Sequence, residues 1–229
     1  LDTSTTIIPL LRDEKACENV WFDSLRLFDS KYFGTLIDKG GNYWKFSKPS
    51  IKRTGRDGID IRGGVGHEVT YPFTEDTGDD AIVITNRREN NVTHPSYNCS
   101  ITGGILIKPG SRGVGGSGIR LGGTGHKVNG TIIVSPNRYG VAISSLDADA
   151  SVRPDEIEIT NVNILGLNEF GEDKPDTSAY FFRDVDTVRI TGGTIKGSSD
   201  GSRVGAAFYF SSNFTGSSGD ARNQNVTIT

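Results

Sequence analysis

The 229-residue chain contains no methionine, only two cysteines and two tryptophans, and 34% hydrophobic residues. No apolar run approaches the roughly 20 residues that cross a bilayer, so we expect no membrane insertion. Basic and acidic residues nearly balance at a net charge of −3, which gives no electrostatic basis for binding nucleic acid. The lack of methionine and of a visible signal peptide leads us to expect a processed segment.

Residues that commonly hold metal ions are also scarce. His67 and His94 have no partner at the spacing of a structural zinc site, and the chain has no Asp-x-Asp-x-Asp-Gly loop for calcium. Cys99 directly precedes a strand-like segment, so we expect a small buried residue rather than half of a disulfide with Cys17. We therefore predict neither a metal site nor a cofactor.

Helical patterns are almost absent. Only residues 13–28 show a partial 3.6-residue period, through apolar residues such as Val20 and Leu27, and this predicts one short helix. The stretch falls within residues 1–55, which hold both tryptophans and no repeat. We interpret residues 1–55 as an N-terminal cap or neck, because the first unit of a solenoid otherwise exposes its apolar end.

The chain is rich in glycine, with 30 residues, and one short phrase recurs along it. The phrase reads Ser-Ile-Thr-Gly-Gly-Ile-Leu-Ile at residues 100–107, and related forms begin at residues 127, 158, 189 and 225. Its equivalent residues are Ile101, Val128, Ile159, Ile190 and Ile228, at steps of 27, 31, 31 and 38 residues. A repeat of this length built from strand-like units predicts a stacked solenoid.

A second strand type accompanies the phrase, for example at residues 58–61, 80–84, 118–121 and 140–143. Apolar residues alternate in these segments, as in half-buried strands. Several short strands per unit, joined by bends at Gly or Asn, predict an all-β, right-handed, single-stranded parallel β-helix over residues 56–229, truncated at its C-terminus. The alternative is an antiparallel sandwich, which requires hairpin turns every 8–12 residues or so and does not explain the repeated phrase.

The sharpest local motif is acidic. Asp79 and Asp80 start one strand of the second type, and Asp57 starts the same strand type 23 residues earlier. Equivalent positions in neighbouring units stack roughly 4.8 Å apart, so we expect the three carboxylates to form one cluster. Glycoside hydrolysis uses one carboxyl to protonate the leaving oxygen and another to activate water or attack carbon. The alternative is that these residues cap turns, where Asp accepts backbone N–H bonds.

Residues 57–60 (Asp-Gly-Ile-Asp) and 78–82 (Gly-Asp-Asp-Ala-Ile) together resemble the acidic motifs of polygalacturonase-type glycoside hydrolases. The resemblance implies a right-handed parallel β-helix that hydrolyses acidic polysaccharides with inversion. It also implies that Asp79 or Asp80 is the general acid and that Asp57 with its neighbour activates water. The family's Gly-His-Gly and Arg-Ile-Lys motifs are only echoed, by residues 125–127 (Gly-His-Lys) and 189–191 (Arg-Ile-Thr).

In its irregular Gly-, Ser-, Thr- and Asn-rich units the chain is also similar to bacteriophage tailspikes and related surface depolymerases. That resemblance implies a homotrimer, located in the virion or outside the cell, that binds a bacterial surface polysaccharide and hydrolyses it. Two alternatives stay open. One is a receptor-binding or structural virion rod without chemistry of its own, because a fold does not fix a function. The other is a secreted pectinase-like hydrolase unconnected with phage.

Five further residues are candidate sugar contacts: His126, Tyr139, Asp147, Asp149 and Glu169. The acidic ones fall in long loops, and the long loops of a solenoid often form its binding face. Each candidate also has a plainer interpretation. His126 follows a Gly-rich turn as a corner residue does, Tyr139 suits core or interface packing, and acidic loop residues are commonly solvated.

Overall fold

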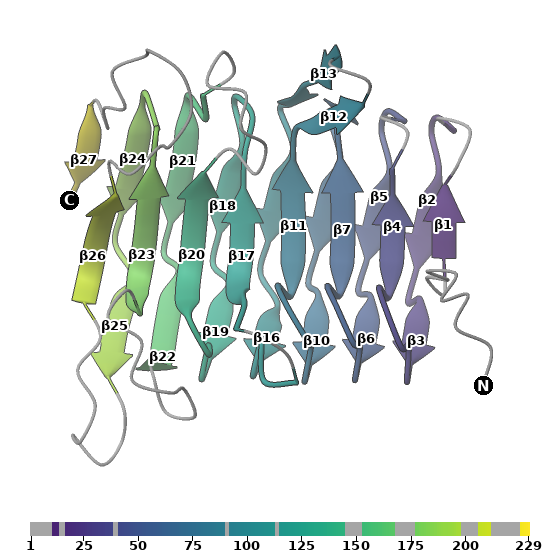
Figure 1. Ribbon diagram of the computed structural model, residues 1–229, viewed down its shortest axis with the longest axis horizontal. Helices are drawn as coiled ribbons and strands as arrows, with labels where there is room; N and C mark the ends of the chain where they lie inside the picture. The colour runs from purple at the N-terminus through teal and green to yellow at the C-terminus, as the bar shows by residue number, and fades with distance from the viewer. Residues whose placement is uncertain are drawn as a thin grey trace.

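The computed structural model describes residues 11–13, 17–38, 41–89, 92–112, 115–144, 153–167, 177–197, 206–211 and 225–229. All regular elements in these ranges are β-strands, and they coil into three long sheets that run along the molecule (Figure 1). No helix in the described ranges has the length and apolar character needed to cross a membrane.

Each sheet collects one strand from successive turns of the coil, which are called rungs below. Sheet A contains β1 (Leu11–Asp13), β4 (Thr35–Ile37), β7 (Ile59–Arg62), β11 (Ile82–Thr85), β17 (Ser117–Leu121), β20 (Tyr139–Ser144), β23 (Ser178–Arg183) and β26 (Ala206–Ser211). Sheet B contains β2 (Trp21–Asp23), β5 (Lys45–Ser47), β9 (Glu68–Thr70), β15 (Ser100–Thr102), β18 (Lys127–Asn129), β21 (Ile157–Thr160), β24 (Val188–Thr191) and β27 (Val226–Ile228). Sheet C contains β3 (Arg26–Phe28), β6 (Ser50–Lys52), β10 (Phe73–Glu75), β16 (Ile105–Ile107), β19 (Ile132–Val134), β22 (Asn163–Leu167) and β25 (Thr194–Gly197).

Two short strand pairs lie outside these sheets. Strand β12 (Arg87–Glu89) pairs with β13 (Val92–His94) in antiparallel fashion, and β8 (Gly64–Val65) pairs with β14 (Ser96–Tyr97) in parallel. Both pairs lie in the connections from sheet A to sheet B, and parallel bridges from Tyr97 to Thr124 and from Thr124 to Asp155 continue the second pair along the coil.

The pairing register confirms the alignment of the repeated phrase. Ile101 pairs with Val128, Val128 with Ile159, Ile159 with Ile190, and Ile190 with Ile228, always in parallel. The second strand type forms sheet A, again with parallel pairs between successive rungs. The prediction of an all-β parallel β-helix is therefore confirmed, and its right-handed sense stays a prediction.

Inward-facing apolar side chains of the three sheets form one continuous core. In sheet A, Ile59, Ile82 and Ile119 stack in register and are fully buried. Tyr180 and Phe208 continue this column at the C-terminal end, with ring centroids 5.4 Å apart. Burying each such side chain contributes about 1.5–3 kcal/mol, and a slip of one residue would turn the whole column outward. The core therefore fixes the register in which polar residues stack on the outside.

The short helix predicted over residues 13–28 is wrong. Its described part contains β2 and β3, which pair in parallel with β5 and β6. Leu25 and Leu27 both pack against the core. Their two-residue spacing is the period of a strand, and the pairing with the next rung decided between the two periods.

Rungs of the coil also lie within residues 1–55, and the role of this segment as a cap stays a prediction. Strands β1 to β6 already belong to sheets A, B and C. Phe22 and Phe46 occupy the column of sheet B that Val69 and Ile101 continue. The predicted boundary at residue 56 thus marks no change of architecture among the described residues. Aromatic residues fill the column in the first rungs, so the β-branched repeat phrase gave no sign of them.

Candidate functional site

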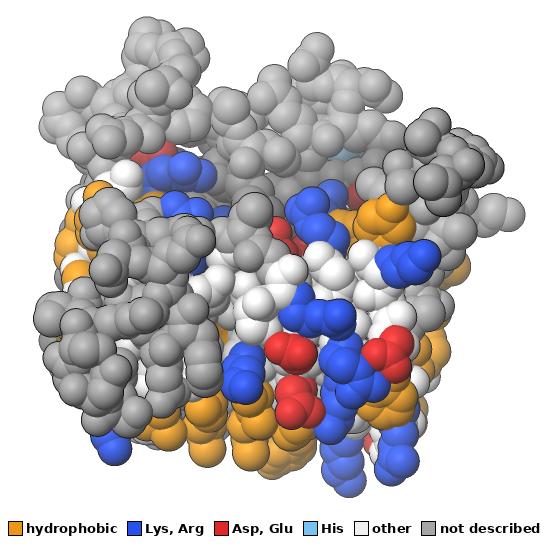
Figure 2. All heavy atoms as spheres, turned by 60° about the horizontal axis from the view of Figure 1, so that its bottom comes forward, with side chains coloured by type: hydrophobic (Ala, Val, Ile, Leu, Met, Phe, Trp, Pro, Cys, Tyr) orange, Lys and Arg blue, Asp and Glu red, His pale blue; other side chains and the backbone are white. Residues whose placement is uncertain are grey.

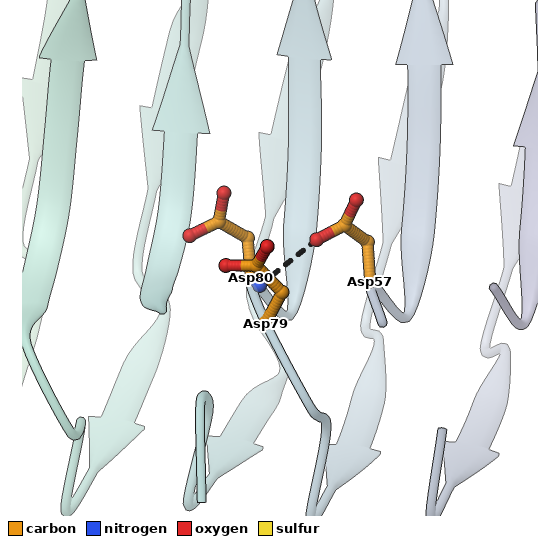
Figure 3. Close-up of side chains that lie close together, drawn as sticks. All are labelled: Asp57, Asp79 and Asp80. Atoms are coloured by element: carbon orange, nitrogen blue, oxygen red, sulfur yellow. Dashed lines mark hydrogen bonds between the residues drawn. The ribbon is translucent and has the colours of Figure 1, made fainter. Parts of the chain in front are cut away.

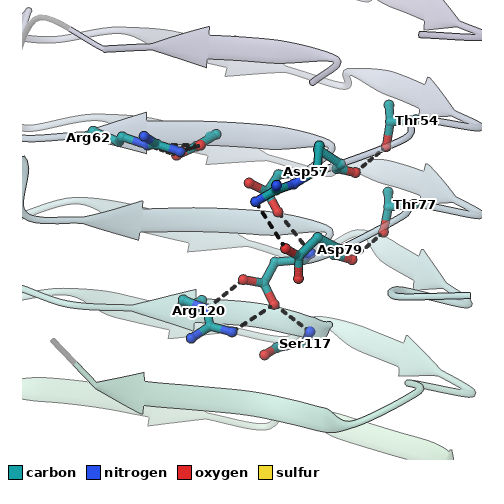
Figure 4. A network of polar contacts seen from close by, with 10 residues as sticks. Thr54, Asp57, Arg62, Thr77, Asp79, Ser117 and Arg120 are labelled. Atoms are coloured by element: carbon teal, nitrogen blue, oxygen red, sulfur yellow. Dashed lines mark hydrogen bonds and ion pairs between the residues drawn. The ribbon is translucent and has the colours of Figure 1, made fainter. Parts of the chain in front are cut away.

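The acidic motif lies where the chain turns from sheet C into sheet A, on two successive rungs. The corner sequence itself is repeated, with Thr-Gly-Arg-Asp at residues 54–57 and Thr-Gly-Asp-Asp at residues 77–80. In both copies the threonine hydroxyl donates to the carbonyl two residues ahead, at 2.6 Å from Thr54 and 2.9 Å from Thr77 (Figure 4). The two corners therefore have the same shape, and each delivers its last aspartate to the start of a sheet A strand.

Glycine is required at this corner because the rungs approach each other closely. A Cβ atom on Gly78 would lie 2.2 Å from the carbonyl oxygen of Gly55. No real side chain tolerates that distance, so the glycines allow the two acidic corners to stack directly. The stacking then brings the side chains of neighbouring rungs together.

The three predicted catalytic aspartates do come together. Asp57, Asp79 and Asp80 each place a carboxylate oxygen within 4.8 Å of the others (Figure 3). The backbone N–H of Asp80 donates to Oδ1 of Asp57 at 2.9 Å, which joins the two rungs. Asp57 and Asp80 are 5% and 3% exposed, whereas the Asp79 side chain is 22% exposed. Asp79 is therefore the member of the cluster that a ligand reaches first.

Asp80 is anchored by the following rung. Its Oδ1 accepts the backbone N–H of Ser117, and its Oδ2 accepts Nε of Arg120, both at 2.5 Å (Figure 4). The Arg120 side chain is only 16% exposed. A charge-assisted pair of this kind, held between a backbone amide and a buried guanidinium, gives Asp80 one fixed orientation.

The other two carboxyls are pushed toward the protonated form. Burial, followed by the charge of Asp80, raises the pKa of Asp79, while Arg120 and Arg56 oppose the shift. Burial, then the charges of Asp60 and Asp80, raises the pKa of Asp57 well above its usual range. Both effects disfavour the charged form. The corner thus combines one carboxylate fixed by an arginine with two carboxyls that retain protons to higher pH than usual.

Two more arginines complete the surroundings. Arg56 lies 3.5 Å from Asp79 through Nη2, and Arg62 pairs with the fully buried Asp60 at 2.6 Å. A hollow of about 280 Å³ lies at the same turns from sheet C into sheet A. It is lined by Lys31, Arg53 and Arg112 together with Asp29. Figure 2 shows Lys and Arg side chains gathered around acidic ones on this side of the molecule.

The trio is also the group of described residues whose oxygens lie close enough to hold a metal ion. Two of its members already have arginine partners, Asp80 with Arg120 and Asp79 with Arg56. These guanidinium groups offset the negative charge that a cation would otherwise offset. The surroundings therefore fit proton transfer at the carboxyls better than ion binding.

The structure corrects the interpretation of His126 as a sugar contact. His126 is 1% exposed, and its Nδ1 accepts the backbone N–H of Cys99 while its Nε2 lies 3.1 Å from the carbonyl oxygen of Gly122. Burial lowers its pKa to about 4. Because both ring nitrogens are used by the backbone, His126 is a corner residue, as its plainer interpretation held.

Tyr139 is also buried rather than open to solvent. It is 3% exposed and stacks on Phe181 of the next rung, with ring centroids 4.5 Å apart. The remaining predicted sugar contacts, Asp147, Asp149 and Glu169, lie outside the described residues.

Sequence reasoning missed Arg120, the residue that fixes Asp80. A signal for it existed, because Arg120 lies in the next strand of the second type after Asp80. In the pairing register, however, Arg120 lies beside Val83 and not beside Asp80. The alignment of strands did not show that the long Arg120 side chain reaches back to the Asp80 carboxylate.

Comparisons with protein family models and with curated protein sequences find no match for this chain. A function for this chain is therefore inferred from the geometry of the acidic corner.

Proposed function

We propose that this protein is a tailspike-type β-helix that binds a bacterial surface polysaccharide and hydrolyses its glycosidic bonds at the acidic corner. The observation that carries the proposal is the cluster of Asp57, Asp79 and Asp80, with oxygens within 4.8 Å and with Asp79 partly exposed. The motif resemblance to polygalacturonase-type hydrolases supports the same chemistry. The resemblance to tailspikes supports a location in the virion or outside the cell.

In this proposal Asp79 is the general acid. Its raised pKa keeps a proton available, and its exposure lets the carboxyl reach the leaving glycosidic oxygen. Asp80, oriented by Arg120, and Asp57 then flank the water or the anomeric carbon on the other side. In the hydrolysis, the C–O bond to the leaving sugar breaks and that oxygen takes the proton of Asp79. Water forms the new bond to carbon, directly in an inverting reaction or by hydrolysis of a carboxylate–sugar intermediate in a retaining one, and gives its proton to a carboxylate.

The spacing of the carboxyls and the motif resemblance favour different stereochemical outcomes. Retaining enzymes place their two carboxyl groups about 5–5.5 Å apart, and inverting enzymes about 6.5–9.5 Å apart. Oxygens within 4.8 Å favour retention, whereas the resemblance implies inversion. NMR of the first anomer released decides between them.

The test is incubation with a panel of purified capsular and O-antigen polysaccharides, scored by reducing ends and by the absorbance of unsaturated products. We expect reducing ends without new absorbance, and we expect Asp80→Asn to abolish them while the fold is kept. New absorbance identifies a lyase and contradicts the proposed reaction. Unchanged turnover of Asp80→Asn contradicts the proposed site.

A specific observation favours a second candidate, a receptor-binding or structural virion rod without chemistry. Asp57 and Asp80 each accept a backbone N–H from a neighbouring rung, which is what purely structural aspartates do. Glycan binding without release of reducing ends would favour this candidate. The other alternative, a secreted pectinase-like hydrolase, predicts a monomer that is active on plant galacturonan.

The proposal includes a homotrimer, and the outer face of sheet C supports self-association. Its outward positions carry a contiguous apolar set, which Figure 2 shows as a row of hydrophobic side chains. The residues are Phe73, Ile105, Ile107, Ile132, Val134 and Leu165. Exposed apolar patches of this kind mark interaction sites. Light scattering of the wild type and of Ile132→Lys tests it, with a trimer expected only for the wild type.

A further inference from the structure

A second hollow with the size of a ligand site lies on sheet B, outside the acidic corner. It has a volume of about 650 Å³, within the range of about 300–1,000 Å³ that is typical of ligand sites. Its lining begins at Asn98, just before β15, and ends at Thr227 in β27. The strands β15, β18, β21, β24 and β27 are successive neighbours in sheet B. The hollow is therefore a groove that crosses five rungs along the axis of the coil.

The wall of the groove is a row of charged residues in register. Lys127, Glu158 and Arg189 occupy the same outward position in successive strands. Lys127 and Glu158 form an ion pair at 3.1 Å and are 68% and 47% exposed. Within the described part of the chain, Arg189 has no ion-pair partner. The sign of the charge thus alternates from rung to rung, at a spacing of about 4.8 Å.

Glu156 adds a second carboxylate to the lining, beside uncharged hydrogen-bonding groups. The amides of Asn98 and Asn225 lie at the two ends, and the hydroxyl of Thr227 continues the charged row. Donors and acceptors therefore repeat along the whole groove. No aromatic side chain lines it among the described residues.

These features select the class of ligand. Nucleic acid requires a basic stripe, whereas cations and carboxylates alternate here. An extended peptide binds by pairing with the edge of a sheet, whereas this groove lies on the face of sheet B. Apolar small molecules require an apolar lining. A linear chain with many hydroxyl groups fits a groove whose polar partners repeat along its length.

We propose that the sheet B groove binds a segment of a polysaccharide chain that lies along the coil axis. This site is distinct from the cluster of Asp57, Asp79 and Asp80 and would hold the polymer independently of its cleavage. The inference rests on the proposed function for the ligand class, and its test separates the two.

The experiment measures binding to an array of purified bacterial O-antigen and capsular polysaccharides, followed by calorimetry with the glycan that binds best. The groove variant is Glu158→Gln combined with Arg189→Gln, which removes one negative and one positive charge and leaves the net charge unchanged. The matched control is Lys45→Gln combined with Glu68→Gln. Lys45 and Glu68 form an ion pair at 2.7 Å in the same outward row of sheet B, two or more rungs before the groove charges.

We expect the groove variant to raise the Kd about tenfold or more and the control to leave it within about twofold. Asp79→Asn should bind like the wild type while releasing no reducing ends. Unchanged affinity of the groove variant overturns the proposal, as does an array on which no glycan binds. If the wild type binds through the groove but cleaves nothing, the groove stands and the proposed hydrolysis fails.

Discussion

Two corners of this β-helix repeat on separate rungs and bury titratable side chains. They differ in whether the backbone uses all the hydrogen-bonding atoms of those side chains. At the corner between sheets A and B, His67 and His126 each follow a Gly-Gly-x-Gly turn. Each ring accepts a backbone N–H from the preceding rung and lies 3.1 Å from a glycine carbonyl oxygen. At the corner between sheets C and A, the aspartates keep carboxylate oxygens that no backbone group uses.

The difference separates structural from chemical repeats. A neutral histidine has one donor and one acceptor, and both are used here, so the histidine corner can only hold the coil together. A carboxylate accepts several hydrogen bonds, and three carboxylates crowded together oppose each other's ionisation. Spare hydrogen-bonding capacity, mutual repulsion and the exposure of Asp79 make the acidic corner the chemical one.

The largest effect is expected from removing the exposed carboxyl. Asp79→Asn deletes the proposed general acid, which typically contributes 10²- to 10⁴-fold, so we expect a loss of about that size in the release of reducing ends. The substitution should not lower the thermal stability, because among the described residues the Asp79 side chain has one ion pair, at 3.5 Å to the exposed Arg56, and its charge is disfavoured by burial.

The matched control for this substitution is Asp76→Asn. Asp76 lies on the same corner, and its carboxylate accepts the hydroxyl of Ser111 outside the acidic cluster. It should retain activity. Equal losses in both variants would mean that the corner tolerates no change of charge and that Asp79 has no special role.

The next effect is on stability. Arg120→Met leaves Asp80 buried without its counter-charge, and breaking a buried pair in this way costs about 3–5 kcal/mol. Urea unfolding measures the loss. Arg56→Met is the control, because Arg56 is 54% exposed and an exposed ion pair contributes about 0–1 kcal/mol. A similar, small loss for both variants would show that Asp80 does not depend on Arg120.

The fold and the acidic cluster could be predicted from the sequence, whereas the contact between Asp80 and Arg120 could not. The repeat of Ile101, Val128, Ile159 and Ile190 predicted the parallel coil, because one inward column needs one apolar residue per rung. The acidic cluster was predictable for a similar reason, since Asp57 and Asp80 begin equivalent strands. The contact with Arg120 was not, because Arg120 pairs with Val83 in the register and only its long side chain reaches Asp80.

The first rungs escaped the sequence analysis for a different physical reason. Their sheet B column holds Phe22 and Phe46 instead of β-branched residues. Aromatic rings stack there, with centroids 5.6 Å apart, and fill the same volume as the later repeat. A column specifies burial and volume, and several residue types meet that demand, so a search for one phrase misses them.

The pH dependence of stability should have opposite signs at the two corners. Burial lowers the pKa of His126 to about 4, below the value near 6.5 in an unfolded chain. The unfolded state then binds more protons, so this stabilisation is present above pH 6.5 or so and is lost as the pH falls toward 4. The raised pKa of Asp79 acts in the other direction, with stability lost as the pH rises through that pKa.

Unfolding free energies measured across pH test this contrast. His126→Gln should flatten the decline of stability between pH 6.5 and about 4. Asp79→Asn should make the decline steeper, because it removes a group whose contribution to stability grows as the pH falls. His94→Gln is the control, because His94 is exposed. A decline that persists in His126→Gln would assign the acid sensitivity to another group.

The smallest effect is expected from Arg56→Gln, and it is the most specific test of the acidic corner. Arg56 lowers the pKa of Asp79 against the larger effects of burial and Asp80. Its removal should therefore raise that pKa further and move the alkaline limb of the activity profile to higher pH, because the general acid then keeps its proton longer. Lys31→Gln, a change of the same charge in the neighbouring hollow, should leave the limb in place. If the limb moves with Lys31→Gln and not with Arg56→Gln, the group that titrates during turnover is not Asp79.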